Sequence, residues 1–236
     1  MKEKLKQLYK NISYKYPSIG FLLRRLYYKK LFNNIRRKTN GNNNTIIYKH
    51  SILSSVLFDI SGNENTIEIA ENCMLTNVMF RIRGNGHRIL IKSGCRFNKG
   101  DIWFEDHNCS LLIGENTTFQ DVHLALTEPN SEIKIGQDCM FAYDIDVRTG
   151  DSHSIISQAS NERINYAENI SIGDHVWVAA HNIILKGSII PNDSVVATGS
   201  IVTKKYNSKG IIIAGNPAKQ IKDGITWSRK RLYKTS

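Results

Sequence analysis

Apolar residues recur at fixed intervals along most of this chain, and two different periods are present. The first period is 22 residues and is shared by four short strings. They read IAENCML, IKSGCRF, IGENTTF and IGQDCMF, and they begin at Ile69, Ile91, Ile113 and Ile135. Each follows a polar turn, and the fifth position is a cysteine in three strings and Thr117 in the other. Equivalent positions of such a repeat are expected to stack along one axis.

The second period is six residues and follows the first along the chain. Its aliphatic positions are Ile172, Val178, Ile184, Ile190, Val196 and Val202. An α-helix repeats about every 3.6 residues and a lone strand about every two, so neither produces a strict six. A triangular solenoid does, with one short strand on each face and the aliphatic side chains pointing inward. We therefore predict an all-β parallel solenoid whose stacked coils bury a continuous apolar column, the longer repeat units being coils with longer turns.

Three segments depart from the repeats. Residues 1–40 carry apolar positions at helical spacing, interrupted by Pro17, and are predicted to form a basic helical segment. The solenoid domain is expected over residues 41–220. A polar stretch at about 149–169 breaks the period and reads as an external loop, which in solenoids commonly marks the functional face. Residues 221–236 are expected to form a tail with a short capping helix.

The net charge of +11 is concentrated at the beginning of the chain. Residues 1–40 hold twelve Lys or Arg and one acid, whereas the remaining residues hold equal numbers of each sign. A nucleic-acid-binding protein would carry its basic surface on the folded domain, so no nucleic-acid partner is expected. Two interpretations of residues 1–38 remain open. They could cap the first coil, or rest as a basic amphipathic helix on an anionic membrane.

The chain shows neither a signal peptide nor an apolar run of about 18 residues, so we expect a cytoplasmic protein, with the inner face of the membrane as the alternative location. Its four cysteines form no CxxC pair. They are therefore expected to be reduced core residues, and no metal is expected.

The six-residue units, the string SIVTK and the string AGNPAKQIK together resemble the hexapeptide-repeat acyltransferases, over about residues 65–222. The string CMFAYDIDVRTGDSHSI, followed by ERI and IGDHVWVAAHNIILKGSIIP, is most similar to the branch that O-acetylates capsular or other cell-surface polysaccharides. The resemblance implies a left-handed β-helix, acetyl-CoA as cosubstrate, a saccharide acceptor, and a homotrimer with sites between neighbouring chains.

The transfer needs a general base, because a sugar hydroxyl is a poor nucleophile at neutral pH and histidine titrates near that pH. His153 matches the D-x-H-S-I element of the family, in which the histidine is the base; the alternative is a loop hydrogen bond. Asp144, Asp146 and Asp151 are candidates to orient it, and the sequence does not choose among them. Asp144, Asp151 and Arg148 are also candidates for binding the acceptor.

By resemblance, seven residues are expected to bind the cosubstrate: Trp177, Ala180, Thr198, Thr203, Lys204, Lys219 and Lys222. Trp177 would lie beside the thioester, or else pack between subunits. The lysines would meet the phosphates as mobile point charges, or else be solvated. A backbone N–H near Ala179 and Ala180 is expected to stabilise the oxyanion. No Cys or Ser motif indicates an acyl-enzyme, so direct transfer is predicted.

Three other functions are weighed against this one. An N-acetyltransferase would use an amine on a nucleotide-linked amino sugar. A γ-class carbonic anhydrase would need a three-histidine zinc site, but His175 and His181 are six residues apart and should point from different faces. A non-enzymatic scaffold is the third, because a fold does not determine a function.

Overall fold

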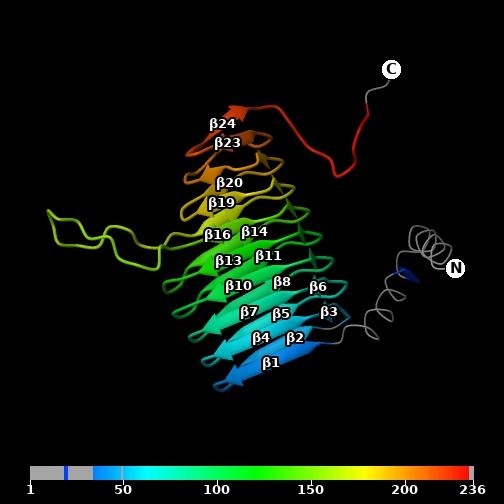
Figure 1. The fold of residues 1–236 in the computed structure, drawn as a ribbon, viewed down its shortest axis with the longest axis vertical. Helices are drawn as coiled ribbons and strands as arrows, with labels where there is room; N and C mark the ends of the chain where they lie inside the picture. The colour runs from blue at the N-terminus through cyan, green and yellow to red at the C-terminus, as the bar shows by residue number, and fades with distance from the viewer. Residues whose placement is uncertain (1–18, 21–33, 49, 234–236) are drawn as a thin grey trace.

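The computed structural model describes residues 19–20, 34–48 and 50–233, and in this part of the chain three parallel sheets enclose one core (Figure 1). The chain visits the sheets in turn, so that each coil contributes one strand to each sheet. Nearly all of residues 1–38, and with them the predicted helices and membrane contact, lie outside the described residues. Within the described residues, no helix has the length and apolar character that a membrane span requires.

The three sheets are named A, B and C in the order in which the chain meets them. Sheet A contains β1 (Ile35–Asn40), β4 (Val56–Ser61), β7 (Val78–Arg83), β10 (Gly100–Phe104), β13 (Val122–Leu126), β16 (Ile145–Arg148), β19 (Asn182–Leu185) and β22 (Ile201–Val202). Sheet B contains β2 (Thr45–Tyr48), β5 (Thr66–Ile69), β8 (Arg88–Ile91), β11 (Ser110–Ile113), β14 (Glu132–Ile135), β17 (Ile170–Ile172) and β20 (Ile189–Ile190). Sheet C contains β3 (Ile52–Ser54), β6 (Met74–Thr76), β9 (Arg96–Phe97), β12 (Thr118–Phe119), β15 (Met140–Phe141), β18 (Trp177–Val178), β21 (Val195–Val196), β23 (Ile212–Gly215) and β24 (Ala218–Lys222).

The strand register reproduces both sequence periods. In the early coils Leu57 pairs with Met79, whereas in the last coils Ile183 pairs with Ile201. Hydrogen bonds between neighbouring coils join residues 22 apart in the first region and 18 apart in the second. The predicted parallel solenoid is therefore confirmed. Among the strands of the described residues, β24 alone breaks the parallel order, because it folds back antiparallel on β23 at the end of the stack.

The prediction of a helical segment up to residue 40 is wrong at its end. Residues 35–40 form β1, which pairs along its whole length with β4. The backbone N–H and C=O groups on the outer edge of β4 need hydrogen-bond partners, and β1 supplies them. This pairing outweighs the helical spacing of the apolar residues in the sequence. The solenoid therefore begins at Ile35.

The short C-terminal helix is also not formed in the described residues. Residues 221–222 extend β24, and residues 223–233 have no regular secondary structure. Gly224 takes a positive φ, which turns the chain. Trp227 and Arg229 then bond to the coils, and these tertiary contacts override helix propensity.

Identical positions stack in the core, as the repeat requires. On sheet C the rings of Phe97 and Phe119 lie 4.2 Å apart and those of Phe119 and Phe141 lie 4.7 Å apart. All three are fully buried. Offset aromatic stacking adds to the burial of their apolar surface, so this column joins three successive coils.

A second column satisfies the backbone at the corner between sheets B and C. Cys73, Cys95, Thr117 and Cys139 each donate to a carbonyl oxygen of the next coil, at 3.1, 3.0, 2.9 and 3.1 Å. A thiol and a hydroxyl thus do the same work in one ladder. Burial raises the pKa of the Cys139 thiol to about 12, so it is protonated and unreactive at neutral pH.

Between β16 and β17 the chain leaves the solenoid at the corner between sheets A and B and forms a projecting arm (Figure 1). Its two limbs pair in antiparallel fashion, with a bridge between Ile156 and Arg163 and a bond of 2.9 Å from Ile164 N to Ile155 O. Ile155, Ile156 and Ile164 are exposed.

The buried side chain of Asn165 holds the two limbs of the arm together at its base. Its Nδ2 donates to the carbonyl of His153 and to Oδ2 of Asp151, each at 2.8 Å. Its Oδ1 accepts the backbone N–H of Ile155 at 2.7 Å. One amide therefore fixes the main chain on both sides of Ser154.

Two ion pairs fasten the arm to the solenoid. Lys186, which follows β19, donates to Oδ2 of Asp151, and Arg163 binds Glu128 at the end of the coil below. Burial opposes ionisation of Asp151, but the hydrogen bonds from Lys186 and Asn165 and the charge of Lys186 outweigh it and lower the pKa of this carboxyl.

We expect Phe119→Ala to lower the free energy of unfolding by about 3–5 kcal/mol, because it opens a cavity in the stacked column. Denaturant unfolding followed by circular dichroism would measure this. Glu68→Ala, at an exposed position of β5, is the control and should change the stability little. A loss below about 1 kcal/mol at Phe119 would contradict the importance of the column.

We expect Lys186→Met to speed hydrogen exchange in residues 151–166, with Lys209→Met as the exposed control. The pKa of Asp151 is lower in the folded arm than in the unfolded chain, so its contribution is complete above about pH 4 and is lost as the pH falls further. Wild-type protection of the arm, corrected for intrinsic exchange, should therefore decrease in acid. In Lys186→Met the same step should be smaller, and an unchanged acid step would show that another group holds the arm.

Candidate active site

His153 lies where the projecting arm leaves the solenoid, with its main chain held and its side chain exposed. Its N–H donates to the carbonyl of Asp151 at 2.8 Å, and its own carbonyl accepts from Asn165. Among the described residues, none forms a hydrogen bond or ion pair with the imidazole. The main chain that carries the imidazole is therefore fixed, and both ring nitrogens are available to a substrate, as a general base requires.

The three acids considered for orienting His153 are occupied elsewhere in this chain. Oδ2 of Asp144 lies 2.9 Å from Nδ1 of His181, and Oδ1 of Asp146 lies 3.1 Å from Nδ1 of His123. Asp151 is held by Lys186 and Asn165. An orienting carboxylate for His153 is thus not supplied within the described part of the chain.

Sequence reasoning missed the pairing of His123 with Asp146 and of His181 with Asp144, because these partners are 23 and 37 residues apart and meet only through coil stacking. In each pair Nε2 of the histidine has no hydrogen-bond partner among the described residues, so each has the form of a catalytic dyad. His123 and His181 are therefore chemical rivals of His153. Two other histidine rings are also hydrogen-bonded. His87 accepts the N–H of Cys109, and Nδ1 of His175 lies 3.0 Å from Oδ1 of Asp193.

Arg148 and Asp146 form an ion pair on the outer face of sheet A, beside His123. Burial works against the charge on Asp146, but hydrogen bonds from His123 and Arg148 lower the pKa of its carboxyl below the ordinary range. This cluster lies directly before the arm in the chain, because Arg148 is the last residue of β16. The structure therefore brings Arg148 close to the start of the His153 arm.

A groove of about 570 Å³ follows the edge of sheet A along the solenoid. Its lining includes one outward side chain from each of six successive coils: Arg36, Leu57, Met79, Asp101, His123 and Asp146. Asp144 lies at the same end as Asp146. Coils are spaced by about 4.8 Å, so the groove extends over about 24 Å.

The carboxylates of this groove are all paired. Asp121 binds Lys99 at 2.8 Å, Asp101 lies 3.4 Å from Nε of Arg81, and Asp144 and Asp146 have the partners already described. Paired carboxylates repel an anionic ligand far less than free ones, since each brings a compensating charge.

The seven residues expected to bind the cosubstrate lie at four separate places. Trp177 is on the outer face of sheet C, between Met140 and Val195 of the neighbouring coils. Ala180 and Thr198 share the corner between sheets C and A, where the N–H of Gly199 donates to the Ala180 carbonyl at 3.0 Å.

Thr203 and Lys204 follow β22 at the corner between sheets A and B, and both are exposed. Lys219 and Lys222 are exposed on β24 at the end of the stack. The arm with His153 leaves the corner between sheets A and B, whereas Trp177 is on sheet C. A single chain therefore does not bring the candidate base and the candidate thioester contact together.

The backbone donors near Trp177 are partly committed. The N–H of Ala179 donates to the carbonyl of Val196 at 2.9 Å, whereas none of the described residues accepts from the N–H of Ala180. Ala180 is therefore the better placed donor for an oxyanion.

His175 and His181 belong to different corners and bind different acids, Asp193 and Asp144. In the part of the chain that the structure describes, no three His, Cys, Asp or Glu side chains are grouped so that they could hold a metal ion.

Comparison with known proteins relates this architecture to two enzymes, although no model of a protein family matches the chain. A polysialic acid O-acetyltransferase of Neisseria meningitidis is 35% identical over 196 residues, which span 83% of this chain and 90% of that protein. A polysialic acid O-acetyltransferase of Escherichia coli O1:K1 / APEC is 37% identical over 131 residues, which span 56% of this chain and 42% of that protein.

Solved structures show the same relationship. A crystal structure of a polysialic acid O-acetyltransferase has a TM-score of 0.79 and 32% identity, and the match covers 86% of this chain and 95% of that one. That of a polysialic-acid-specific acetyltransferase has a TM-score of 0.72 and 32% identity, with coverage of 85% and 92%. The predicted left-handed β-helix is thereby confirmed. The chain belongs to the hexapeptide-repeat acyltransferases, in the branch that contains the polysialic acid O-acetyltransferases.

Proposed function

We propose that this acetyltransferase moves an acetyl group from acetyl-CoA to a hydroxyl of a bacterial capsular or other surface polysaccharide, with His153 as general base. The observation that carries the proposal is the identity of 35% with a polysialic acid O-acetyltransferase over 83% of the chain. Polysialic acid is therefore the first acceptor to test. The exposed imidazole of His153, on an arm held by Asn165, supports the assignment of the base.

In the proposed reaction, one imidazole nitrogen of His153 takes the proton of the acceptor hydroxyl as that oxygen attacks the thioester carbonyl. The N–H of Ala180 donates to the oxygen that becomes negative in the tetrahedral intermediate. The intermediate then collapses, the carbon–sulfur bond breaks, and the imidazolium returns its proton to the departing sulfur. The products are the sugar ester, CoA and the neutral enzyme.

We further propose a homotrimer in which His153 of one chain faces Trp177 of the next. Two findings support it. The arm with His153 leaves the corner between sheets A and B whereas Trp177 lies on sheet C, and Ile155, Ile156 and Ile164 on the arm are exposed in the described part of the chain. Apolar side chains on a projecting element are typical of a contact with another protein surface.

Coenzyme A is proposed to bind across the same interface. Trp177 would lie against the thioester, Ala180 and Thr198 would border the pantetheine arm at their shared corner, and Thr203 and Lys204 would come from a different corner. Lys219 and Lys222 share one exposed strand, which suits the binding of phosphates by mobile cations.

The acceptor is proposed to be a polymer that lies in the groove of sheet A. The groove is long in one direction, and Asp144 and the Asp146–Arg148 cluster are at the end nearer the arm. Asp144 and Arg148 are proposed to contact the sugar. Asp151 contributes mainly by holding the arm, because its carboxylate is already bound by Lys186 and Asn165. A peripheral contact of residues 1–38 with the inner face of the membrane remains a proposal that rests on their positive charge.

We expect His153→Ala to lower acceptor-dependent thiol release by about 10²-fold or more, because the proton of the hydroxyl then has no acceptor. Purified protein would be assayed with acetyl-CoA and polysialic acid. His107→Ala is the matched control, because His107 lies in an exposed turn. Near wild-type turnover in His153→Ala, together with loss in His123→Ala or His181→Ala, would move the role of base to one of those pairs.

We expect two strongly impaired variants to restore each other. If His153 comes from one chain and Trp177 from the next, co-expression of His153→Ala with Trp177→Ala in equal amounts leaves one site in four intact. About a quarter of the wild-type activity should then return. Separately purified proteins mixed without exchange of subunits are the control. Recovery of no activity from verified mixed trimers would show that both residues act within one chain.

A further inference from the structure

Residues 223–233, called here the C-terminal strap, run back over the corner between sheets B and C after the last strand. The strap begins where the N–H of Ile225 donates to the carbonyl of Gly210 at 2.9 Å. It ends with two strongly exposed residues, Leu232 and Tyr233. Between these points two side chains, Trp227 and Arg229, bond to the solenoid.

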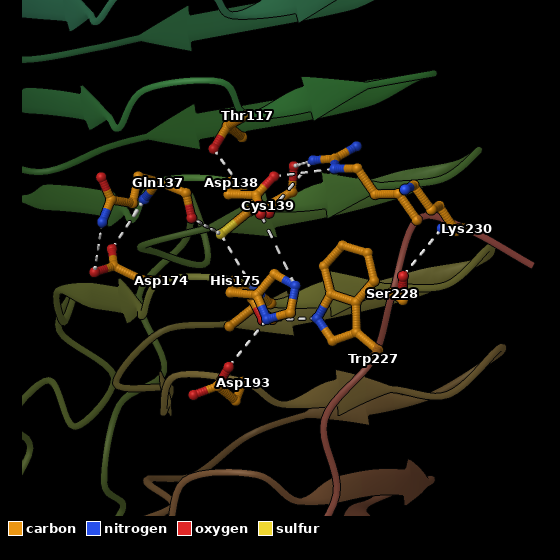
Figure 2. Close-up of polar contacts among 12 residues, drawn as sticks. Thr117, Gln137, Asp138, Cys139, Asp174, His175, Asp193, Trp227, Ser228 and Lys230 are labelled. Carbon is orange, nitrogen blue, oxygen red and sulfur yellow. Dashed lines mark hydrogen bonds and ion pairs between the residues drawn. The ribbon is translucent and has the colours of Figure 1, made fainter.

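Trp227 is the buried residue of the strap, with 9% of its surface exposed. Its ring stacks on that of His175, with the ring centroids 4.3 Å apart and the planes inclined by 10°. Figure 2 shows the two side chains next to each other. Its Nε1 donates to the carbonyl of His175 at 2.7 Å. A stacked ring and a directed hydrogen bond together leave this indole one orientation.

His175 is itself held in place. Its Nδ1 lies 3.0 Å from Oδ1 of Asp193, and its Nε2 lies 3.9 Å from Oδ2 of Asp138 (Figure 2). These acids belong to the corners of the coils on either side. The His175 ring that Trp227 stacks on is therefore held rigidly against the solenoid.

Arg229 tethers the strap further along the stack. Its guanidinium donates to Oδ1 of Asp138 at 3.0 Å, to the carbonyl of Cys139 at 2.9 Å and to Oγ1 of Thr118 at 3.0 Å. It also lies 5.6 Å from the ring of Trp227. Arginine suits this place, because its planar fork can meet several acceptors at once.

Trp177 lies directly beside this assembly. Its ring centroid is 6.1 Å from that of Trp227, with the planes inclined at 47°. Along sheet C it is flanked by the outward side chains of Met140 and Val195. Trp227 therefore closes the side of Trp177 that faces the corner between sheets B and C, and the strap is the only described segment outside the sheets with a ring contact to it.

We propose that Trp227 is a positioning residue of the acetyl transfer, which acts by holding the indole of Trp177 in the orientation that meets the thioester. The inference rests on the proposed function, which places Trp177 at that thioester. An outward tryptophan on a strand has several staggered side-chain orientations, and a neighbouring ring at van der Waals distance removes some of them. Selecting the productive orientation in advance lowers the cost of reaching the transition state.

The contact itself is tested first, in the full-length protein without substrate. Two indoles this close couple their electronic transitions and give a paired signal in the far-ultraviolet circular dichroism. We expect Trp177→Phe and Trp227→Phe each to remove the same signal, whereas Trp103→Phe on sheet A keeps it. Different signals lost in the two variants would show that the rings are not coupled, which would overturn the inference.

The functional effect is tested by a double-mutant cycle. We expect Trp227→Ala to lower kcat for acetyl transfer by about 10-fold to 100-fold, and Trp227→Phe to restore most of it. In the background of Trp177→Ala, the same Trp227→Ala change should have almost no further effect, because it acts through the residue already removed. An equal loss in both backgrounds, or no loss in the wild-type background, would overturn the inference.

Release of the strap without loss of the indole provides the second variant. Arg229→Gln is expected to lower kcat several-fold, whereas Lys230→Gln, whose side chain has no partner among the described residues, should leave it unchanged. Full kcat in Arg229→Gln together with a loss in Trp227→Ala would limit the tether to a structural role. The His153→Ala assay keeps the two proposals apart: if that variant is inactive while Trp227→Ala is fully active, the inference fails and the proposed function stands.

Discussion

The structure depends on one constraint: every coil must place its inward residues directly over the equivalent residues of the coil before it. Parallel backbone hydrogen bonds join each strand to the strand one coil away, so a residue in the core meets its own counterpart. Phenylalanine therefore stacks on phenylalanine on sheet C, and thiols and Thr117 follow one another at a corner. The corners must also be narrow: a Cβ on Gly173 would lie 2.2 Å from Oδ1 of Asn192. Core, corners and surface are consequences of the same repetition.

That repetition is also why so much of the fold could be predicted from the sequence. A strict six-residue period has few structural solutions, and the 22-residue period predicts the inward ladder of Cys73, Cys95, Thr117 and Cys139. The residues predicted wrongly are those where the period ends. β1 took its conformation from the free edge of β4, and the segment after β24 took its path from Trp227 and Arg229. Such contacts join residues far apart in the chain, so no local sequence pattern predicts them.

The candidate site divides in the same way. The interruption of the repeat and the motif around His153 could be predicted from the sequence, because both are formed by neighbouring residues. The partners were not: Asn165 and Lys186 fasten the arm, and Asp144 and Asp146 bind His181 and His123. Coil stacking creates these pairs, so they depend on how many residues each intervening turn contains. Polar residues spaced by one coil can be neighbours in space, and only the register tells which ones meet.

The arm enters and leaves the solenoid at a single corner. Ile145 still pairs with Asn182, 37 positions later, in the same register as its neighbours in ordinary coils. The strand pairing of the stack therefore does not depend on the length or composition of the inserted segment. Such a scaffold can therefore carry a different external segment at this corner while the strand pairing of the core stays the same.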